Sequence, residues 1–251
     1  MAESPQPWVL RLAHLYPRLM NIYGDRGNIL CLRHRCQERG IEFRVTELGL
    51  GDPLDPKAFD LIFIGGAQDR EQRRVAEDLR SVKGGALRQA VEEDVVVLAV
   101  CGGYQLLGRF YRAASGEELA GLGIFDAWTI HPGEGARRCI GNVVAEWEGG
   151  TLVGFENHGG RTYLGQGAGL LARVRSGFGN NGRDRTEGAR YRQAFGTYLH
   201  GALLPKNPHL ADALIRAALI RRYGPLDLPI IDSRLELLAH EAALRLVGSR
   251  R

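Results

Sequence analysis

The feature that most constrains the fold is an apolar run that ends at a cysteine and two glycines. Residues 95–100 are all apolar and mostly valine. A run without polar alternation is typical of a strand buried on both faces, as in the centre of a parallel sheet covered by helices. Cys101, Gly102 and Gly103 follow at once, and helical spacing begins there. The sequence therefore predicts a strand–turn–helix unit with a cysteine at the carboxyl edge of a parallel sheet.

The rest of the first half alternates between strand and helix signals. Strands are expected at residues 8–16, 42–48 and 59–64, and helices at 27–39, 86–93 and 103–111. This alternation implies right-handed crossovers between parallel strands. We therefore expect an α/β fold, a flavodoxin-like doubly wound sheet that is mostly parallel, with helices on both faces.

After residue 115, glycine, aromatic and β-branched residues become frequent, which favours antiparallel strands. Short strands are expected at 124–130, 140–147, 152–156, 171–174 and 191–199, and a polar mobile loop at 176–188. Helices are expected at 207–223 and 232–247. We interpret the chain as one domain, residues 8–223, with a helical appendix at 224–251. The last helix carries an apolar stripe that either docks a partner or packs on its own domain: Leu235, Leu238, Ala242 and Leu246.

Composition excludes several classes of protein. The net charge is only +4, and no basic block with interleaved aromatic residues indicates nucleic-acid binding. No stretch approaches the ~20 apolar residues of a membrane span. Residues 1–7 lack the features of a signal peptide, so a cytoplasmic location is expected. The four cysteines have neither CxxC nor zinc spacing, so we expect free thiols and no metal: Cys31, Cys36, Cys101 and Cys139.

Cys101 has the surroundings of a nucleophile. Ala99 precedes it by two residues and Gly102 and Gly103 follow it, so a tight turn would leave its thiol projecting at the sheet edge. The start of the next helix would favour the thiolate. The alternative is a buried structural cysteine at the end of a core strand. The flanking small residues favour the nucleophile.

A thiolate nucleophile also needs a base and an oxyanion hole. Gly65 and Gly66 end the strand at 59–64, where backbone amides can turn toward an oxyanion, although a plain connecting turn has the same pattern. His200 ends a predicted strand and is the favoured base. His158, followed by two glycines, is the rival base.

These residues resemble the class I (triad) glutamine amidotransferases. Residues 100–105, Val-Cys-Gly-Gly-Tyr-Gln, carry the elbow motif, with the glycine pair upstream and His200 downstream. Ala99 replaces the usual glycine, and Ala202 stands where the family usually has the acid of the triad. The missing acid resembles the branch of the cobyric acid synthase type.

Within that branch, residues 19–28, 154–162 and 196–201 resemble the amidotransferase subunits of two-protein lipid II isoglutaminyl synthases. The resemblance covers residues 10–223. It implies that Cys101 attacks the side-chain amide of glutamine and that His200 moves the protons. It assigns oxyanion binding to the backbone amides of Gly66 and Gly102. It assigns substrate binding to Arg138, Gln105 and His158.

The resemblance also implies a heterodimer. Ammonia would pass to a Mur-ligase-like synthetase (MurT), which amidates the α-carboxylate of D-glutamate in the lipid II stem peptide to D-isoglutamine, in peptidoglycan synthesis. This chain has no G-x-x-x-x-G-K-[ST] loop, so it carries no cofactor, and ATP and Mg²⁺ belong to the partner. Three alternatives stay open: another acceptor such as a corrinoid carboxylate, a cysteine peptidase or thiol chaperone on a similar sheet, and a non-catalytic scaffold.

The group that orients His200 is open as well. Glu156, Asp69 or Asp25 could reach it within the chain, or a partner could supply a carboxylate across the interface. The resemblance favours the partner, and with it weak glutaminase activity alone that rises when the partner is added. Asp25 lies in Gly-Asp-Arg-Gly-Asn, residues 24–28, which is either a helix-capping turn or a segment that faces the site or a partner.

Overall fold

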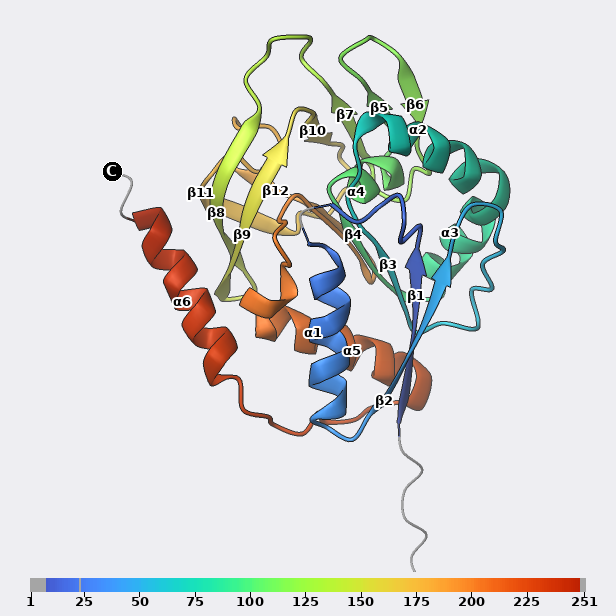
Figure 1. The fold of residues 1–251 in the computed structure, drawn as a ribbon, viewed down its shortest axis with the longest axis vertical. Helices are drawn as coiled ribbons and strands as arrows, with labels where there is room; N and C mark the ends of the chain where they lie inside the picture. The colour runs from blue at the N-terminus through green and yellow to red at the C-terminus, as the bar shows by residue number, and fades with distance from the viewer. Residues whose placement is uncertain (1–7, 23, 249–251) are drawn as a thin grey trace, which may run out of the picture.

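A computed structural model describes residues 8–22 and 24–248 and has a six-stranded sheet at its centre (Figure 1). The strand order is β13-β14-β4-β3-β1-β2. The parallel strands are β1 (Val9–Leu15), β2 (Glu42–Leu48), β3 (Leu61–Ile64), β4 (Val96–Val100) and β14 (Ala194–Thr197), and β13 (Ala189–Tyr191) is the antiparallel edge. The expected α/β class with a mostly parallel sheet is confirmed.

Helices cover this sheet. They are α1 (Arg26–Gln37), α2 (Asp69–Asp78), α3 (Gly84–Glu92), α4 (Gly102–Leu107) and α5 (Pro208–Tyr223), with the π-helical turn η1 (Leu79–Lys83) between α2 and α3 and the 3-10 turn η2 (Leu204–Lys206) before α5. Helix α1 packs against α5, and α2 packs against α4. Every residue of β3 and β4 is buried, as expected for strands covered on both faces. The central sheet is therefore a rigid support for the loops at its carboxyl edge.

The sequence prediction failed at two places in the first half. The helix expected at 103–111 ends at Leu107, because Gly108 adopts an extended conformation and β5 (Phe110–Arg112) follows. Helix α2 was missed, since Val75 and Ala76 are its only apolar residues and give no clear periodicity. This missed helix matters because it lies beside the elbow.

The second half forms two smaller sheets that are largely antiparallel, as expected. One has the order β10-β7-β5-β6, with β6 (Glu118–Ala120), β7 (Ala127–Ile130) and β10 (Arg161–Leu164); the other has the order β12-β11-β8-β9, with β8 (Cys139–Trp147), β9 (Gly150–His158), β11 (Ala172–Ser176) and β12 (Thr186–Glu187). Only β5 and β7 pair in parallel among these strands. A bridge between Phe155 and His200 joins β9 to the chain that leaves the central sheet. The end of β9 is thereby brought to the carboxyl edge of the central sheet.

The segment 176–188, predicted to be mobile, is instead packed against β9. The backbone N–H groups of Phe178 and Gly179 donate to the buried carboxylate of Glu156, at 2.6 and 2.8 Å. The side chains of Asn180 and Asn181 are buried and hydrogen-bonded. Polar composition misled the prediction here, because these polar groups bond to the protein rather than to solvent.

Helix α6 (Arg234–Gly248) attaches through one face only. Glu236 pairs with Arg35 of α1 at 3.0 Å, and His240 bonds to Thr151 at 2.9 Å. The predicted apolar stripe points away, with Leu235 80% exposed. The interpretation that the stripe packs on its own domain is therefore wrong, and its role as a docking face stays a prediction. Within residues 8–22 and 24–248, no helix has the length and apolarity needed to cross a membrane.

Candidate active site

The turn after β4 has the strained geometry expected of a nucleophile elbow. Cys101 has φ 50° and ψ −105°, a conformation that L-residues rarely adopt. A Cβ atom on Gly103 would stand 2.8 Å from the carbonyl oxygen of Ile64, so only glycine allows the helix to start this close to β3. The tight turn therefore aims the Cys101 side chain away from the core at the carboxyl edge of the sheet.

A cleft of about 480 Å³ opens over Cys101. Its walls come from both halves of the chain, and they include all three residues predicted to bind substrate. The lining residues include Gln72, Cys101, Gln105, Arg138, Asn157 and His158. The structure thus brings the predicted nucleophile and the predicted binding residues to one cavity.

His200 reaches this site from the chain that follows β14. Its side chain is fully buried. A Cβ atom added to Gly66 would lie 3.0 Å from Cε1 of His200 and 3.2 Å from Cβ of Cys101, so both side chains lie beside Gly66. Burial disfavours the imidazolium, but the charge of Cys101 and the carboxylate of Asp25 outweigh it and raise the pKa of His200 to about 10. His200 therefore carries a proton at neutral pH, beside Cys101.

Asp25 is the in-chain acid that the structure brings to His200. Its Oδ1 atom lies 3.5 Å from Nδ1 of His200, and both side chains are fully buried. Glu156, another candidate, binds the amides of the 176–188 segment and faces His158 at 3.6 Å. The side chain of Asp69, the third candidate, lies outside the described residues. Of the two candidates whose side chains the structure describes, Asp25 is the one with a contact to the histidine.

The backbone amide of Gly66 is engaged in a way that the sequence did not suggest. Its N–H donates to Oδ2 of Asp25 at 2.7 Å. In this structure that N–H is therefore occupied, and its predicted role in binding an oxyanion stays a prediction. The N–H of Gly102 belongs to the first turn of α4, whose amides lack intrahelical acceptors. A Cβ atom added to Gly102 would lie 3.0 Å from the backbone nitrogen of Ala67, so the backbone of Gly102 and that of Ala67 are close neighbours.

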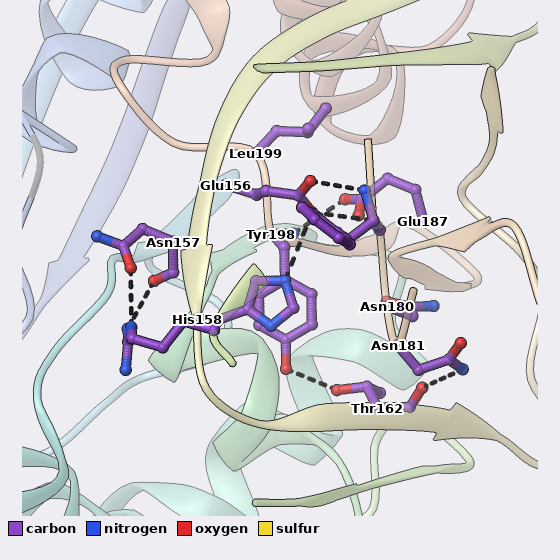
Figure 2. Close-up of polar contacts among 12 residues, drawn as sticks. Glu156, Asn157, His158, Thr162, Asn180, Asn181, Glu187, Tyr198 and Leu199 are labelled. Carbon is purple, nitrogen blue, oxygen red and sulfur yellow. Dashed lines mark hydrogen bonds and ion pairs between the residues drawn. The ribbon is translucent and has the colours of Figure 1, made fainter. Parts of the chain in front are cut away.

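His158, the rival base, is held as part of the cleft wall. Its ring stacks on that of Tyr198 (Figure 2), and the ring centroids are 3.7 Å apart. Nδ1 is 2.8 Å from the carbonyl oxygen of Gly160, and Nε2 faces Glu156. Burial lowers the pKa of His158. Both histidines are buried beside a carboxylate, but the pKa of His158 is lowered while that of His200 is raised.

Gln105 and Arg138 both line the cleft, but they differ in what they can offer a ligand. The amide of Gln105 is used by the protein, since its Oε1 accepts from Gln72 and its Nε2 donates to Tyr198, both at 3.0 Å. Arg138 is exposed at the mouth, and Asn157 accepts from its Nε at 3.0 Å and from its Nη2 at 3.1 Å. Arg138 is therefore a fixed positive charge that a carboxylate can reach.

Sequence reasoning missed Gln72, which lies on the unpredicted helix α2. Its Nε2 donates to the carbonyl oxygen of Ala67 at 3.1 Å and to Gln105. Its Oε1 is buried and has no hydrogen-bond partner among the described residues. An unsatisfied acceptor in a cleft wall suits a ligand N–H group. Only the position of α2, directly after the glycine turn, could have indicated this residue.

The site generates a prediction about thiol reactivity. Burial raises the pKa of Cys31 and Cys36 to about 12 and that of Cys139 to about 11, so these three stay protonated thiols at pH 7.5. Because the thiolate is the reactive form, iodoacetamide should modify Cys101 before the other three. Peptide mass spectrometry over a time course measures the order. Earlier modification of any other cysteine in the folded protein would contradict the assignment.

Known sequences match this chain over most of its length. A family model, the CobB/CobQ-like glutamine amidotransferase domain, matches residues 11–208. The chain is 40% identical to the lipid II isoglutaminyl synthase (glutamine-hydrolyzing) subunit GatD of Staphylococcus aureus, covering 94% of this chain and 95% of that protein. It is also 40% identical to the GatD subunit of Streptococcus pneumoniae, with 96% and 92% covered. A probable cobyric acid synthase of Methanopyrus kandleri is 37% identical over 60% of this chain but only 32% of its own length.

Solved structures agree on the fold. The glutaminase domain of a Trypanosoma brucei CTPS with bound acivicin matches with a TM-score of 0.54 at 14% identity, over 88% of this chain and 98% of that one. A glutamine amidotransferase from Thermotoga maritima matches with a TM-score of 0.53 at 16% identity, over 95% and 92%. At such identities these likenesses concern the fold alone. The family match and the two 40% identical relatives show that the chain belongs to the CobB/CobQ-like glutamine amidotransferases.

Proposed function

We propose that this chain hydrolyses glutamine and supplies the ammonia to a synthetase that amidates lipid II. The observation that carries the proposal is Cys101 on a strained elbow, facing a buried His200 beneath a cleft with Arg138 at its mouth. The GatD relatives, which are named as glutamine-hydrolyzing, support the choice of substrate.

The first half-reaction follows from the charges of the pair. The Cys101 thiolate attacks the side-chain carbonyl carbon of glutamine, and the carbonyl oxygen becomes an oxyanion. We assign its stabilisation to the N–H of Gly102 with that of Ala67, because Asp25 occupies the N–H of Gly66. The imidazolium of His200 then donates its proton to the leaving nitrogen. Ammonia departs, and a glutamyl thioester and a neutral histidine remain.

The second half-reaction restores the enzyme. Neutral His200 takes a proton from water, and the hydroxide attacks the thioester carbon. Collapse releases glutamate and the Cys101 thiolate, while His200 is again an imidazolium. We assign the α-carboxylate of glutamine to Arg138 and an N–H group of the substrate to Oε1 of Gln72. His158 and Gln105 then act by shaping the cleft wall from which Arg138 and Gln72 reach the substrate.

The second subunit is part of the proposal. A carboxylate does not react with ammonia until it is activated, and we assign that step, with its ATP and Mg²⁺, to a Mur-ligase-like partner of the MurT type. The acceptor would be the α-carboxylate of D-glutamate in lipid II, and the product D-isoglutamine for peptidoglycan. The four buried free cysteines are compatible with the cytoplasm as the compartment. The GatD relatives, which are named as subunits, support the two-chain arrangement.

Replacing the nucleophile tests the glutaminase activity directly. Cys101→Ala should lower the rate of glutamate release from glutamine by at least about 10³-fold, because no thioester can form. Cys139→Ala is the matched control, and it should retain activity. Glutamate is measured by a coupled dehydrogenase assay, with circular dichroism to check folding. Near wild-type hydrolysis by Cys101→Ala would refute the mechanism.

The two histidines should differ in which kinetic constant they change. His200→Ala should lose about 10²–10⁴-fold in kcat, the usual contribution of a general acid–base group. His158→Ala should act mainly on KM, since its ring supports the cleft wall through Tyr198. Both constants are obtained from initial rates over a glutamine series. A larger kcat loss in His158→Ala would reverse the assignment of the base.

Ammonia rescue tests the acceptor and the partner together. With the synthetase subunit, ATP, Mg²⁺ and lipid II, wild-type chain and glutamine should yield amidated lipid II. The Cys101→Ala complex should amidate only when an ammonium salt replaces glutamine, because its defect lies in ammonia supply. Mass spectrometry of the stem peptide gives the readout. If the wild-type pair leaves lipid II unchanged but amidates a corrinoid carboxylate, the acceptor is the one of the alternative hypothesis.

A further inference from the structure

We propose that Gln72 distinguishes glutamine from glutamate in the cleft, because its Oε1 accepts an N–H of the substrate's side-chain amide. The proposal rests on the proposed glutamine hydrolysis, and it names which N–H group of the substrate meets Gln72. The side chain is only 2% exposed and lines the cleft. Its Oε1 has no hydrogen-bond partner within residues 8–22 and 24–248.

The protein itself sets the orientation of the Gln72 amide. Nε2 donates to the carbonyl oxygen of Ala67 at 3.1 Å and to Oε1 of Gln105 at 3.0 Å. A backbone carbonyl can only accept a hydrogen bond, so the NH₂ group has to face Ala67. Turning the amide over would place two oxygen atoms against each other at this contact. Oε1 therefore stays on the side of the amide that no described protein donor meets.

Gln105 cannot take this role, because both ends of its amide are engaged. Its Oε1 accepts from Gln72, and its Nε2 donates to the hydroxyl of Tyr198 at 3.0 Å. The hydroxyl of Tyr198 is in turn 2.6 Å from that of Thr162. These groups form one hydrogen-bonded chain that ends at Gln72. Buried polar groups are almost always satisfied, so an acceptor left over in a cleft wall indicates a donor on the ligand.

Gln72 lies at the end of the cleft that holds the nucleophile. A Cβ atom added to Gly102 would lie 2.7 Å from Nε2 of Gln72, so this side chain packs against the residue that directly follows Cys101. Ala67, whose carbonyl oxygen holds Nε2, lines the same cleft. Cys101 attacks the side-chain amide of the substrate, whereas the α-carboxylate is assigned to Arg138 at the mouth. Oε1 of Gln72 therefore meets the amide nitrogen rather than the α-amino group.

An oxygen acceptor at this place favours the substrate over the product. The amide of glutamine carries N–H donors, whereas the carboxylate of glutamate carries none and presents only oxygen lone pairs. Glutamate bound in the same way would set a negatively charged oxygen against Oε1 of Gln72 in a buried contact. A site that hydrogen-bonds an N–H of its substrate also rejects analogues that lack it. Gln72 thus helps glutamine to bind and glutamate to leave.

Gln72→Met tests this specificity, because methionine has a similar length but no strong donor or acceptor. The value of kcat/KM for glutamine should fall by about 10–100-fold, since a buried N–H loses its acceptor. The γ-methyl ester of glutamate has no N–H at this place, but it needs the same thiolate and the same oxyanion contacts. Its kcat/KM should fall much less. Gln89→Met, at an exposed position of α3, is the matched control and should change neither value.

The comparison of the two substrates separates specificity from support of the elbow. A loss that is larger for glutamine than for the ester supports the proposal. An equal or larger loss for the ester would overturn it, because Gln72 would then only hold Ala67 and Gly102 in place. Unchanged kcat/KM for glutamine would overturn it as well. Circular dichroism checks that the variant is folded.

Binding to the Cys101→Ala chain gives a readout that needs neither turnover nor a variant of Gln72. Isothermal titration calorimetry compares glutamine with its methyl ketone analogue, in which a methyl group replaces the amide NH₂. Glutamine should bind about 10–100-fold more tightly. Equal affinities would contradict the proposal. If the wild-type chain releases no glutamate from glutamine, the proposed function fails, while the calorimetry still decides whether the cleft recognises the amide N–H.

Discussion

The contact of Asp25 with Gly66 and His200 is the interaction on which the site depends. It joins the start of α1, the turn after β3 and the chain after β14. The strand order explains how they meet, because β14 and β3 are the two neighbours of β4, whose end carries Cys101. Parallel strands present their carboxyl ends at one edge, so His200 and Gly66 flank the nucleophile from either side. Asp25 lies in the chain after β1, the next strand in the sheet, and contacts both Gly66 and His200.

The same contact explains how the site tolerates so much buried charge. A fully buried imidazolium or carboxylate alone would be costly, but each group here has an opposite charge or an N–H donor as its neighbour. His158 also faces a carboxylate, Glu156 at 3.6 Å, but there burial outweighs the carboxylate and lowers the pKa. The pKa values of the two histidines thus shift in opposite directions, and we assign proton transfer to His200.

The sequence predicted well whatever depends on residues adjacent in the chain. The buried run at 95–100, the elbow at Cys101 and the strand ending before His200 are local patterns, and the structure has all of them. It could not choose among Glu156, Asp69 and Asp25, because 175 residues separate Asp25 from His200. It could not reveal that the N–H of Gly66 bonds to Asp25, because a glycine pair does not show which acceptor its N–H finds. The sequence did not predict α2, which carries Gln72, because this largely charged helix shows no apolar periodicity.

The position of the acid follows from how α1 enters the fold. Glycine at position 27 lets the helix approach Ala202 until their atoms touch, and that approach is what brings Asp25 within reach of Nδ1. Any side chain at 27 would push the helix outward and lengthen the contact between Asp25 and His200. Position 202 therefore holds a small residue against the helix, and the carboxylate that contacts His200 comes from the residue that precedes α1.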